Sequence, residues 1–315
     1  ESLYFEDILI GEVWVCSGQS NMQWTVKDSL NADAEIAAAN YPNLRLFYVK
    51  RVVAETPQED CATDHQWLAA TPETVPGFSA VGYFFGRDLH QALNVPVGLI
   101  HTSWGGTPSE SWTSAAAAAA EPAFAPITER WNQIVANHPE AMKAFEAATA
   151  EWQAKKDKGE ATDQDKPRPP QGPDSPHRIS SLYNAMINPL IPYGIKGAIW
   201  YQGESNAGRY DEYKVLLPAM IKGWRRAWGH EFPFLIVQLA NFMERNSTPV
   251  DSDWARLREA QVYTTQVLPN TQIAVTVDIG DAADIHPRNK QDVGGRLALA
   301  ARETVYGSTK MGLSP

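Results

Sequence analysis

Short apolar segments alternate with longer amphipathic segments along most of this chain, and this alternation limits the folds open to it. Several short segments are apolar on both faces, as are the central strands of a parallel sheet covered by helices. We predict strands over residues 12–16, 44–49, 95–102, 197–202, 234–239 and 272–278. Helical spacing of apolar residues predicts helices over 78–93, 210–228, 254–267 and 292–305. The alternation predicts a doubly wound α/β fold.

The segment 115–171 interrupts this alternation. It holds an alanine run, a predicted helix over residues 139–156 and a charged, proline-rich stretch that ends near residue 170. We interpret it as a helical and proline-rich insertion, at about 115–171, in a single domain that spans residues 1–315. Two roles are open for it: a wall or lid of a substrate pocket, or a decoration packed on the side of the domain.

The charge balance argues against two classes of partner. The chain has 27 Lys and Arg against 37 Asp and Glu, a net charge of -10, and an acidic surface repels phosphates and anionic lipid heads. We therefore expect neither nucleic acid nor a membrane as a partner, while the oligomeric state is open. The two cysteines, Cys16 and Cys61, are too few for a disulfide framework. Metal-ligand spacings and glycine-rich nucleotide motifs are absent from the sequence, so we predict neither a metal nor another cofactor.

The first predicted strand runs directly into a tight polar turn, Ser-Gly-Gln-Ser-Asn, at residues 17–21. Open α/β sheets bind their ligands at the carboxyl ends of the strands. Ser20 in such a turn can point its hydroxyl into a crevice, and its backbone N–H can help to hold an oxyanion. The motif is not Gly-x-Ser-x-Gly, because Met22 stands at its last position. The other interpretation is an ordinary turn in which Ser20 or Asn21 caps a helix.

Two further turns offer hydrogen-bond donors. Gly105 and Gly106 follow the second of the central strands, and paired glycines let backbone N–H groups approach a ligand closely. Gln202 ends another strand, and its side-chain amide suits a developing oxyanion. Glu204 and Asn206 follow it, and Glu204 is either an acid or an anchor for the loop.

The last turn holds three aspartates and His286, just before the final helix. Serine is a poor nucleophile until a base takes its proton, and histidine suits that task near neutral pH. A carboxylate beside the ring would fix its tautomer. His101 and His177 are rival bases. Together the turns supply a nucleophile, oxyanion donors and a base, which predicts a serine hydrolase.

Four ordered blocks resemble the sialate O-acetylesterase family, a group of the SGNH-hydrolase superfamily close to carbohydrate esterases that act on acetylated xylan. The blocks are Gly-Gln-Ser-Asn-Met at 18–22, Ser-Trp-Gly-Gly-Thr at 103–107, Trp-Tyr-Gln-Gly-Glu-Ser-Asn at 200–206 and Asp-Ile-His-Pro-Arg-Asn-Lys at 284–290. The resemblance runs nearly end to end. It implies a flavodoxin-like, three-layer α/β/α fold with a central parallel sheet, and a metal-free esterase that removes O-acetyl groups from sialic acid or xylan.

The resemblance also implies roles for the site residues. Ser20 would be the nucleophile and His286 its base, with an oxyanion hole from the Ser20 N–H, a Gly105 or Gly106 N–H and a side-chain amide. The superfamily asparagine that supplies this amide is replaced by Ser205, so Gln202 is our first candidate and Asn206 our second.

The third member of the catalytic group also departs from the superfamily pattern. The position three residues before His286 is Ala283. Asp284 is the expected partner of the histidine, with Asp281 or a Ser–His dyad as alternatives. Two other functions stay open: a carbohydrate-binding module on a hydrolase-like fold, and an acyl hydrolase such as a lipase or thioesterase. Acetylated glycans as substrates would suit secretion or the periplasm.

Overall fold

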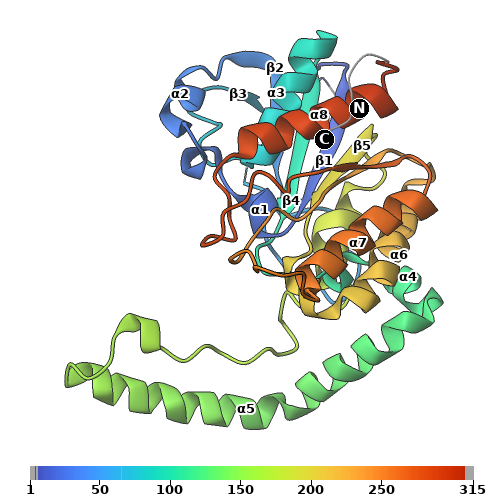
Figure 1. Ribbon diagram of the computed structural model, residues 1–315. Coiled ribbons are helices and arrows are strands. Elements are labelled where there is room, and N and C mark those ends of the chain that lie inside the picture. The colour runs from blue at the N-terminus through green and yellow to red at the C-terminus, as the bar shows by residue number, and fades with distance from the viewer. Residues whose placement is uncertain (1–3, 5, 65, 309–315) are drawn as a thin grey trace.

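A seven-stranded sheet forms the centre of the computed structural model, which describes residues 4, 6–64 and 66–308 (Figure 1). Its strands are β1 (Glu12–Gly18), β2 (Tyr41–Tyr48), β3 (Leu68–Ala70), β4 (Val97–Ser103), β5 (Gly197–Tyr201), β6 (Phe234–Val237) and β7 (Thr271–Ala274). The order across the sheet is β3-β2-β4-β1-β5-β6-β7. All neighbours are parallel except β3, which runs antiparallel to β2 at the edge. The two ends of the predicted domain, 1–3 and 309–315, lie outside the described residues.

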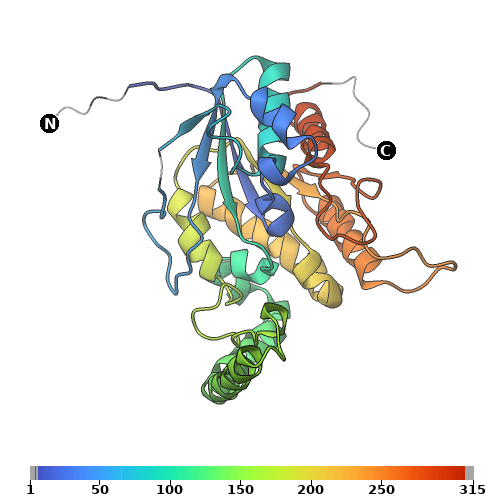
Figure 2. The same ribbon diagram turned by 90° about the vertical axis from the view of Figure 1, so that its left-hand side faces the viewer.

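Helices cover both faces of this sheet (Figures 1 and 2). Successive residues of a strand point to opposite faces, and the register of β1 with β5 therefore puts Trp14 and Trp200 on opposite faces. Trp14 packs against Phe85 of α3 (Ala80–Leu93), and Trp200 packs against Trp224 of α6 (Tyr210–Trp228). Helix α8 (Lys290–Thr304) packs beside α3, and α7 (Asp253–Val267) packs beside α6. The predicted three-layer α/β/α fold is confirmed.

Most predicted elements lie where the pattern placed them. All six predicted strands are present, although the last two end at Val237 and Ala274, two and four residues early. Strand β3 was not predicted, because its three residues are too few to show an alternating pattern. The short helices α1 (Ser20–Gln23) and α2 (Ala32–Ala37) were also not predicted as elements.

Strand β1 lies at the centre of the sheet, between β4 and β5. The chain passes from β1 to one half of the sheet and later returns to the other half, so the ends of β1, β4 and β5 form a topological switch point. Gly18 and its partners Ser103 and Tyr201 end these strands side by side. Gly18 has φ 141°, and a Cβ atom there would lie 2.1 Å from the Tyr201 carbonyl oxygen. Only glycine lets β1 turn into α1 at this distance from β5.

The segment 115–171 contributes no strand. It contains α4 (Ala115–Ala120), the long helix α5 (Ala125–Asp157) and an irregular return. Figures 1 and 2 show α5 projecting from the layered body, with the return chain running back beside it. The predicted helix start at 139 is wrong, because α5 begins at Ala125 and passes through Pro139. A proline in a helix interior removes one backbone hydrogen bond, and the flanking residues are good enough helix formers to continue past it.

None of the helices in the described part of the chain combines the length and apolar character needed to cross a membrane.

Candidate active site

Ser20 and His286 meet at the carboxyl end of β1, although 266 positions separate them in the sequence. Ser20 is the first residue of α1, and His286 lies in the loop between β7 and α8. The His286 Nε2 atom lies 2.8 Å from the Ser20 Oγ atom, which is hydrogen-bonding distance. The Trp24 ring stacks on the imidazole, with ring centroids 5.1 Å apart and planes 16° from parallel. The imidazole is therefore held from one face and at one nitrogen.

The surroundings of His286 favour its uncharged form. Partial burial lowers the pKa of the imidazole below its ordinary value, and the ammonium of Lys290 lowers it further. The carboxylate of Asp284 opposes both effects. An uncharged imidazole can accept the Ser20 hydroxyl proton at Nε2, so the pair has the arrangement of a serine nucleophile with a general base.

The two aspartates nearest His286 bond to the loop backbone instead of to the ring. Asp284 accepts a hydrogen bond from the His286 backbone N–H at 2.8 Å, and Asp281 accepts one from the Ala283 N–H at 2.8 Å. The Asp284 Oδ1 atom lies 3.7 Å from His286 Nδ1, beyond hydrogen-bonding distance. In this geometry Asp284 acts on the ring through its charge alone, and the expected hydrogen bond of a Ser–His–Asp triad is not formed.

The two predicted side-chain oxyanion donors are directed elsewhere. Gln202 and Asn206 are fully buried. The Gln202 amide donates to Asn206 Oδ1 at 2.7 Å and to the Thr107 carbonyl at 3.3 Å, while the Asn206 amide donates to Glu110 at 2.9 Å. Both amides have buried partners in this structure, and the role of either one as an oxyanion donor stays a prediction. They tie the loops after β4 and β5 together.

Backbone N–H groups are better placed. Gly105 lies so near the serine that a Cβ atom on it would be 3.2 Å from Ser20 Cβ. Its N–H donates to the Gln23 side-chain oxygen at 2.7 Å. Gly106 is exposed, with a φ of 76° and open space where a side chain would be. Sequence reasoning missed Gln23, which lies three residues after Ser20 on α1 and therefore on the same side of the helix.

The rival histidines do not contact Ser20. His101 is buried on β4, where its Nε2 lies 2.6 Å from the Ser103 hydroxyl and burial lowers its pKa to about 3. His177 contacts the Gln171 side chain, and burial lowers its pKa as well. It lies beside Gly106, so it belongs to the surroundings of the site without reaching the serine.

A pocket of about 370 Å³ adjoins the loops that flank Ser20. Gly106 and Ser205 line it from the loops after β4 and β5, and residues that include Ile127, Trp131 and Ile134 line it from α5. Trp112, which also follows the β4 turn, is fully buried against Trp200 and serves the core.

Charged side chains of this pocket are already paired. Arg130 makes two hydrogen bonds of 2.7 Å to Glu212, and Arg209 bridges Glu212 at 3.0 Å and Glu110 at 2.7 Å. Two cations therefore face two anions, and the lowered pKa of His177 keeps that ring uncharged at neutral pH. The pocket presents polar edges and an aromatic ring without a net charge.

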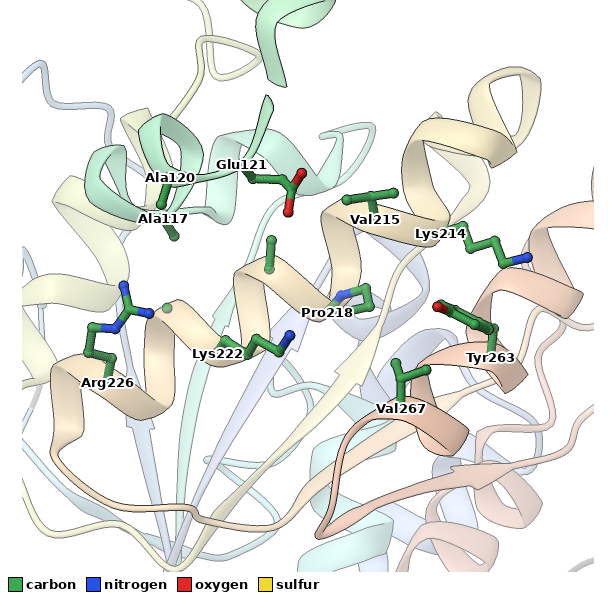
Figure 3. Close-up of a pocket in the computed structure, with 12 residues that line it drawn as sticks. Ala117, Ala120, Glu121, Lys214, Val215, Pro218, Lys222, Arg226, Tyr263 and Val267 are labelled. Atoms are coloured by element: carbon green, nitrogen blue, oxygen red, sulfur yellow. The ribbon is translucent and has the colours of Figure 1, made fainter. Parts of the chain in front are cut away.

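A second pocket, of about 500 Å³, lies among α4, α6 and α7 and is drawn in Figure 3. Lys214, Pro218 and Tyr263 are among its lining residues, and none of the predicted site residues belongs to it. Within the described ranges, no three His, Cys, Asp or Glu side chains gather as a metal site would require.

Comparison with known proteins gives consistent matches. A family model described as carbohydrate esterase, sialic acid-specific acetylesterase, matches residues 10–165 and 172–303. The chain is 34% identical to human sialate O-acetylesterase over 98% of its own length and 56% of that protein, and 34% identical to the mouse protein over 98% and 59%. It thus spans little more than half the length of these curated relatives.

Solved structures agree with the sequence matches. A carbohydrate acetylesterase from Xanthomonas citri is 38% identical, with a TM-score of 0.72, over 95% of this chain and 57% of that one. A protein from Arabidopsis thaliana is 15% identical, with a TM-score of 0.51, over 94% of this chain and 98% of that one, and it shares the fold alone.

Proposed function

The chain belongs to the carbohydrate esterase family of sialic acid-specific acetylesterases, and on this premise we propose that it removes O-acetyl groups from carbohydrates through an acetyl-enzyme on Ser20. The observation that carries the proposal is the 2.8 Å contact between Ser20 Oγ and His286 Nε2. Acyl transfer by serine requires at least a nucleophile and a base within hydrogen-bonding distance of each other.

The reaction proceeds in two halves. His286 Nε2 takes the hydroxyl proton as Ser20 Oγ forms a bond to the acetyl carbonyl carbon. The tetrahedral intermediate collapses, the bond to the sugar oxygen breaks, and His286 returns the proton to that oxygen. His286 then takes a proton from water, whose oxygen attacks the acetyl carbonyl carbon. As the bond to Ser20 Oγ breaks, His286 returns that proton to Oγ, and acetate leaves.

Backbone N–H groups stabilise the oxyanion in this proposal. The Ser20 N–H is the first of α1 and has no partner within the helix, and the exposed Gly106 N–H lies on the neighbouring turn. In the free protein the Gly105 N–H donates to the Gln23 side-chain oxygen. It becomes a third oxyanion donor once the Gln23 side chain moves away. Asp284 supports the imidazolium by its charge.

The pocket beside Ser20 is our proposed sugar site. On this view the chain is one esterase domain, residues 115–171 are an insertion, and α5 supplies the pocket wall with Trp131 as a stacking surface. Because the arginines of the pocket are paired with glutamates, an uncharged acetylated sugar fits it better than a sialic acid carboxylate. Substrates of this kind occur outside cells, so we also propose secretion or a periplasmic location.

The test is acetate release from acetylated xylan and from 9-O-acetylated sialic acid, with wild type and Ser20→Ala in parallel. Ser247→Ala, at an exposed serine far from β1 in the sequence, is the matched control. Release that disappears only in Ser20→Ala supports the proposal, and the better substrate decides the sugar class. Normal turnover by Ser20→Ala would refute it. Binding of xylan without release would favour a carbohydrate-binding module, and hydrolysis of long acyl chains alone would favour a lipase or thioesterase.

A further inference from the structure

A hydrogen-bonded cluster of polar side chains lies beside the Ser20–His286 contact and plays no part in the steps above. Asn21, Glu204 and Lys290 form it, and we name these three residues the buried lysine cluster. Lys290 is fully buried at the start of α8, and its ammonium donates to the Asn21 side-chain oxygen. The Asn21 amide donates to Glu204 Oε1 at 2.6 Å. Three separate elements thus meet at one asparagine.

The cluster is joined to both members of the catalytic pair. Asn21 directly follows Ser20 on α1. Its amide also donates to the carbonyl of Ile285, the residue before His286, at 3.0 Å. Lys290 lies four residues after His286 on the same stretch of chain. The backbone on either side of the histidine is therefore attached to the turn that carries the serine.

This attachment matters because the usual support of the histidine is missing. The Asp284 carboxylate is 3.7 Å from Nδ1 and forms no hydrogen bond to the ring. Among the described residues, the ring itself is held by the Trp24 stack and the Ser20 contact. The loop that carries the ring is held by the buried lysine cluster. The cluster therefore helps to position His286, as a hydrogen-bonded aspartate does in a triad.

The surroundings of Lys290 keep a charge there in the relevant pH range. Its ammonium lies over the rings of Trp24 and Tyr201, at 5.8 Å and 5.4 Å from their centroids. Glu204 and Asp284 are the acidic groups that face it, and His286 is the basic one. Burial lowers the pKa of Lys290 to about 7, so the ammonium persists below pH 7, the range in which a histidine would otherwise take up a proton.

We propose that Lys290, held by Asn21 and Glu204, is a positioning residue for His286 that fixes the histidine loop against α1 and keeps the ring in its proton-accepting form in mildly acidic solution. The inference rests on the proposed function, because it assigns Lys290 a task in the same reaction. It is distinct from a purely structural role, since a structural role leaves the protonation of His286 unchanged.

The sign of the expected effect follows from the charges. Lys290→Met removes the ammonium while keeping a long side chain, and it takes away a cation that opposes the rise in the Glu204 pKa caused by burial. His286 loses a neighbouring positive charge while Asp284 remains, so its pKa rises. The acid limb of kcat/KM, which reports the free enzyme's base, moves to higher pH.

The experiment is the pH profile of kcat/KM on 4-nitrophenyl acetate for the full chain. We expect the acid limb of Lys290→Met to move up by about 0.5 to 1 pH unit, a modest shift for a neighbouring charge.

The double variant Lys290→Met, Glu204→Gln leaves no buried charge unpaired, so it keeps the test available if the single variant fails to fold. Glu204→Gln alone is expected to shift the limb in the same direction, because it lets the lysine lose its proton more readily. Lys143→Met, at an exposed lysine on α5, is the control with an unmoved limb.

The outcomes separate this inference from the proposed function. An acid limb that stays at its wild-type position in the folded variants, with or without a lower kcat, overturns the inference. Ser20→Ala, measured in the same series, tests the proposed function. If this variant turns over substrate at the wild-type rate, the esterase mechanism itself is refuted. If Ser20→Ala is inactive and the acid limb of kcat/KM does not move in the Lys290 variants, the positioning role alone is refuted.

Discussion

The carboxyl edge of the sheet and helix α5 are held in place by different kinds of contact. At the edge, buried polar side chains from distant parts of the chain bond to one another, as Asn21 bonds to Glu204 and Lys290. Helix α5 has 33 residues, of which only Ile127 and Trp152 are buried. Its contacts are mostly local, such as the Glu151–Lys155 pair one turn apart at 2.7 Å.

The difference shows where precision is needed. A base must lie within hydrogen-bonding distance of its nucleophile, and only a network of several elements fixes two side chains to that tolerance. A pocket wall needs only to present a surface. Trp152, at the far end of α5, is buried by residues close to it in the sequence. Its ring nitrogen donates to the Thr162 carbonyl at 2.9 Å, and the ammonium of Lys156 lies over its face. Changes at the edge should therefore alter chemistry, and changes in α5 should alter substrate binding at most.

The largest expected effect is at the edge. We expect His286→Ala to lower kcat by roughly 10⁴-fold or more, because the serine loses its base. The ring is only partly buried, so the variant should stay folded, as circular dichroism and thermal unfolding would check. Loss of less than tenfold would mean that another group serves as the base. His177 is the first such group to examine, since Asp174 precedes it by three residues and it lines the pocket.

A smaller effect is expected at Asp284. Its carboxylate does not hydrogen-bond to the His286 ring, so Asp284→Ala should lower kcat by no more than about tenfold, far less than the loss of a bonded triad aspartate. Steady-state kinetics beside Asp281→Ala give the comparison. A loss approaching that of His286→Ala would show that Asp284 moves into bonding distance of Nδ1 once substrate binds, which would contradict the role assigned here.

The helix should affect binding and leave the chemical step alone. We expect Trp131→Ala to raise KM about fivefold on an acetylated oligosaccharide, since an aromatic contact of this kind stabilises by about 1 kcal/mol. KM for 4-nitrophenyl acetate, which has no sugar to stack, should not change. Asn132→Ala, at the exposed neighbouring position, is the control. Equal losses on both substrates would remove α5 from the sugar site.

The smallest effect on catalysis is expected at Pro139. Pro139→Ala restores a backbone donor within α5 and should stabilise the helix by up to about 3 kcal/mol, without changing kcat or KM beyond twofold. Hydrogen exchange of the α5 amides measures the first quantity and acetate release the second. A marked fall in kcat would show that Pro139 helps to shape the site, and the contrast between the two regions would then fail.

The predictability of the two regions follows from the same difference. The strands and the helices that cover them were predicted because burial between two layers imposes an apolar pattern that a local window can read. Ser20 and His286 were predicted because each follows a strand end, and parallel strands bring their ends to one edge. The start of α5 was missed because a proline suggests a boundary, whereas the exposed helix formers on both sides continue past it.

The contacts at the site that the sequence did not predict arise between distant parts of the chain. Gln202 and Asn206 have the right chemistry for an oxyanion donor, but hydrogen bonds to Thr107 and Glu110 from other loops turn them inward. Lys290 ends the block at 284–290, but nothing local predicted its burial, because a lysine at a helix start is usually a solvated surface residue. Its burial depends on Asn21 and Glu204, which lie 269 and 86 positions away in the sequence.

The sequence by itself determined the layered α/β fold, and it predicted the edge of the sheet, the serine and the histidine that we propose for the chemistry. These follow from periodicity and from the position of polar turns after apolar strands, both of which are local properties. Only the tertiary structure decided which donors lie near Ser20, that Asp284 stops short of the ring, and that Asn21 links Glu204 and Lys290 beside it. Those outcomes depend on distances between side chains far apart in the chain, and a difference of about one ångström separates a hydrogen bond from a purely electrostatic contact.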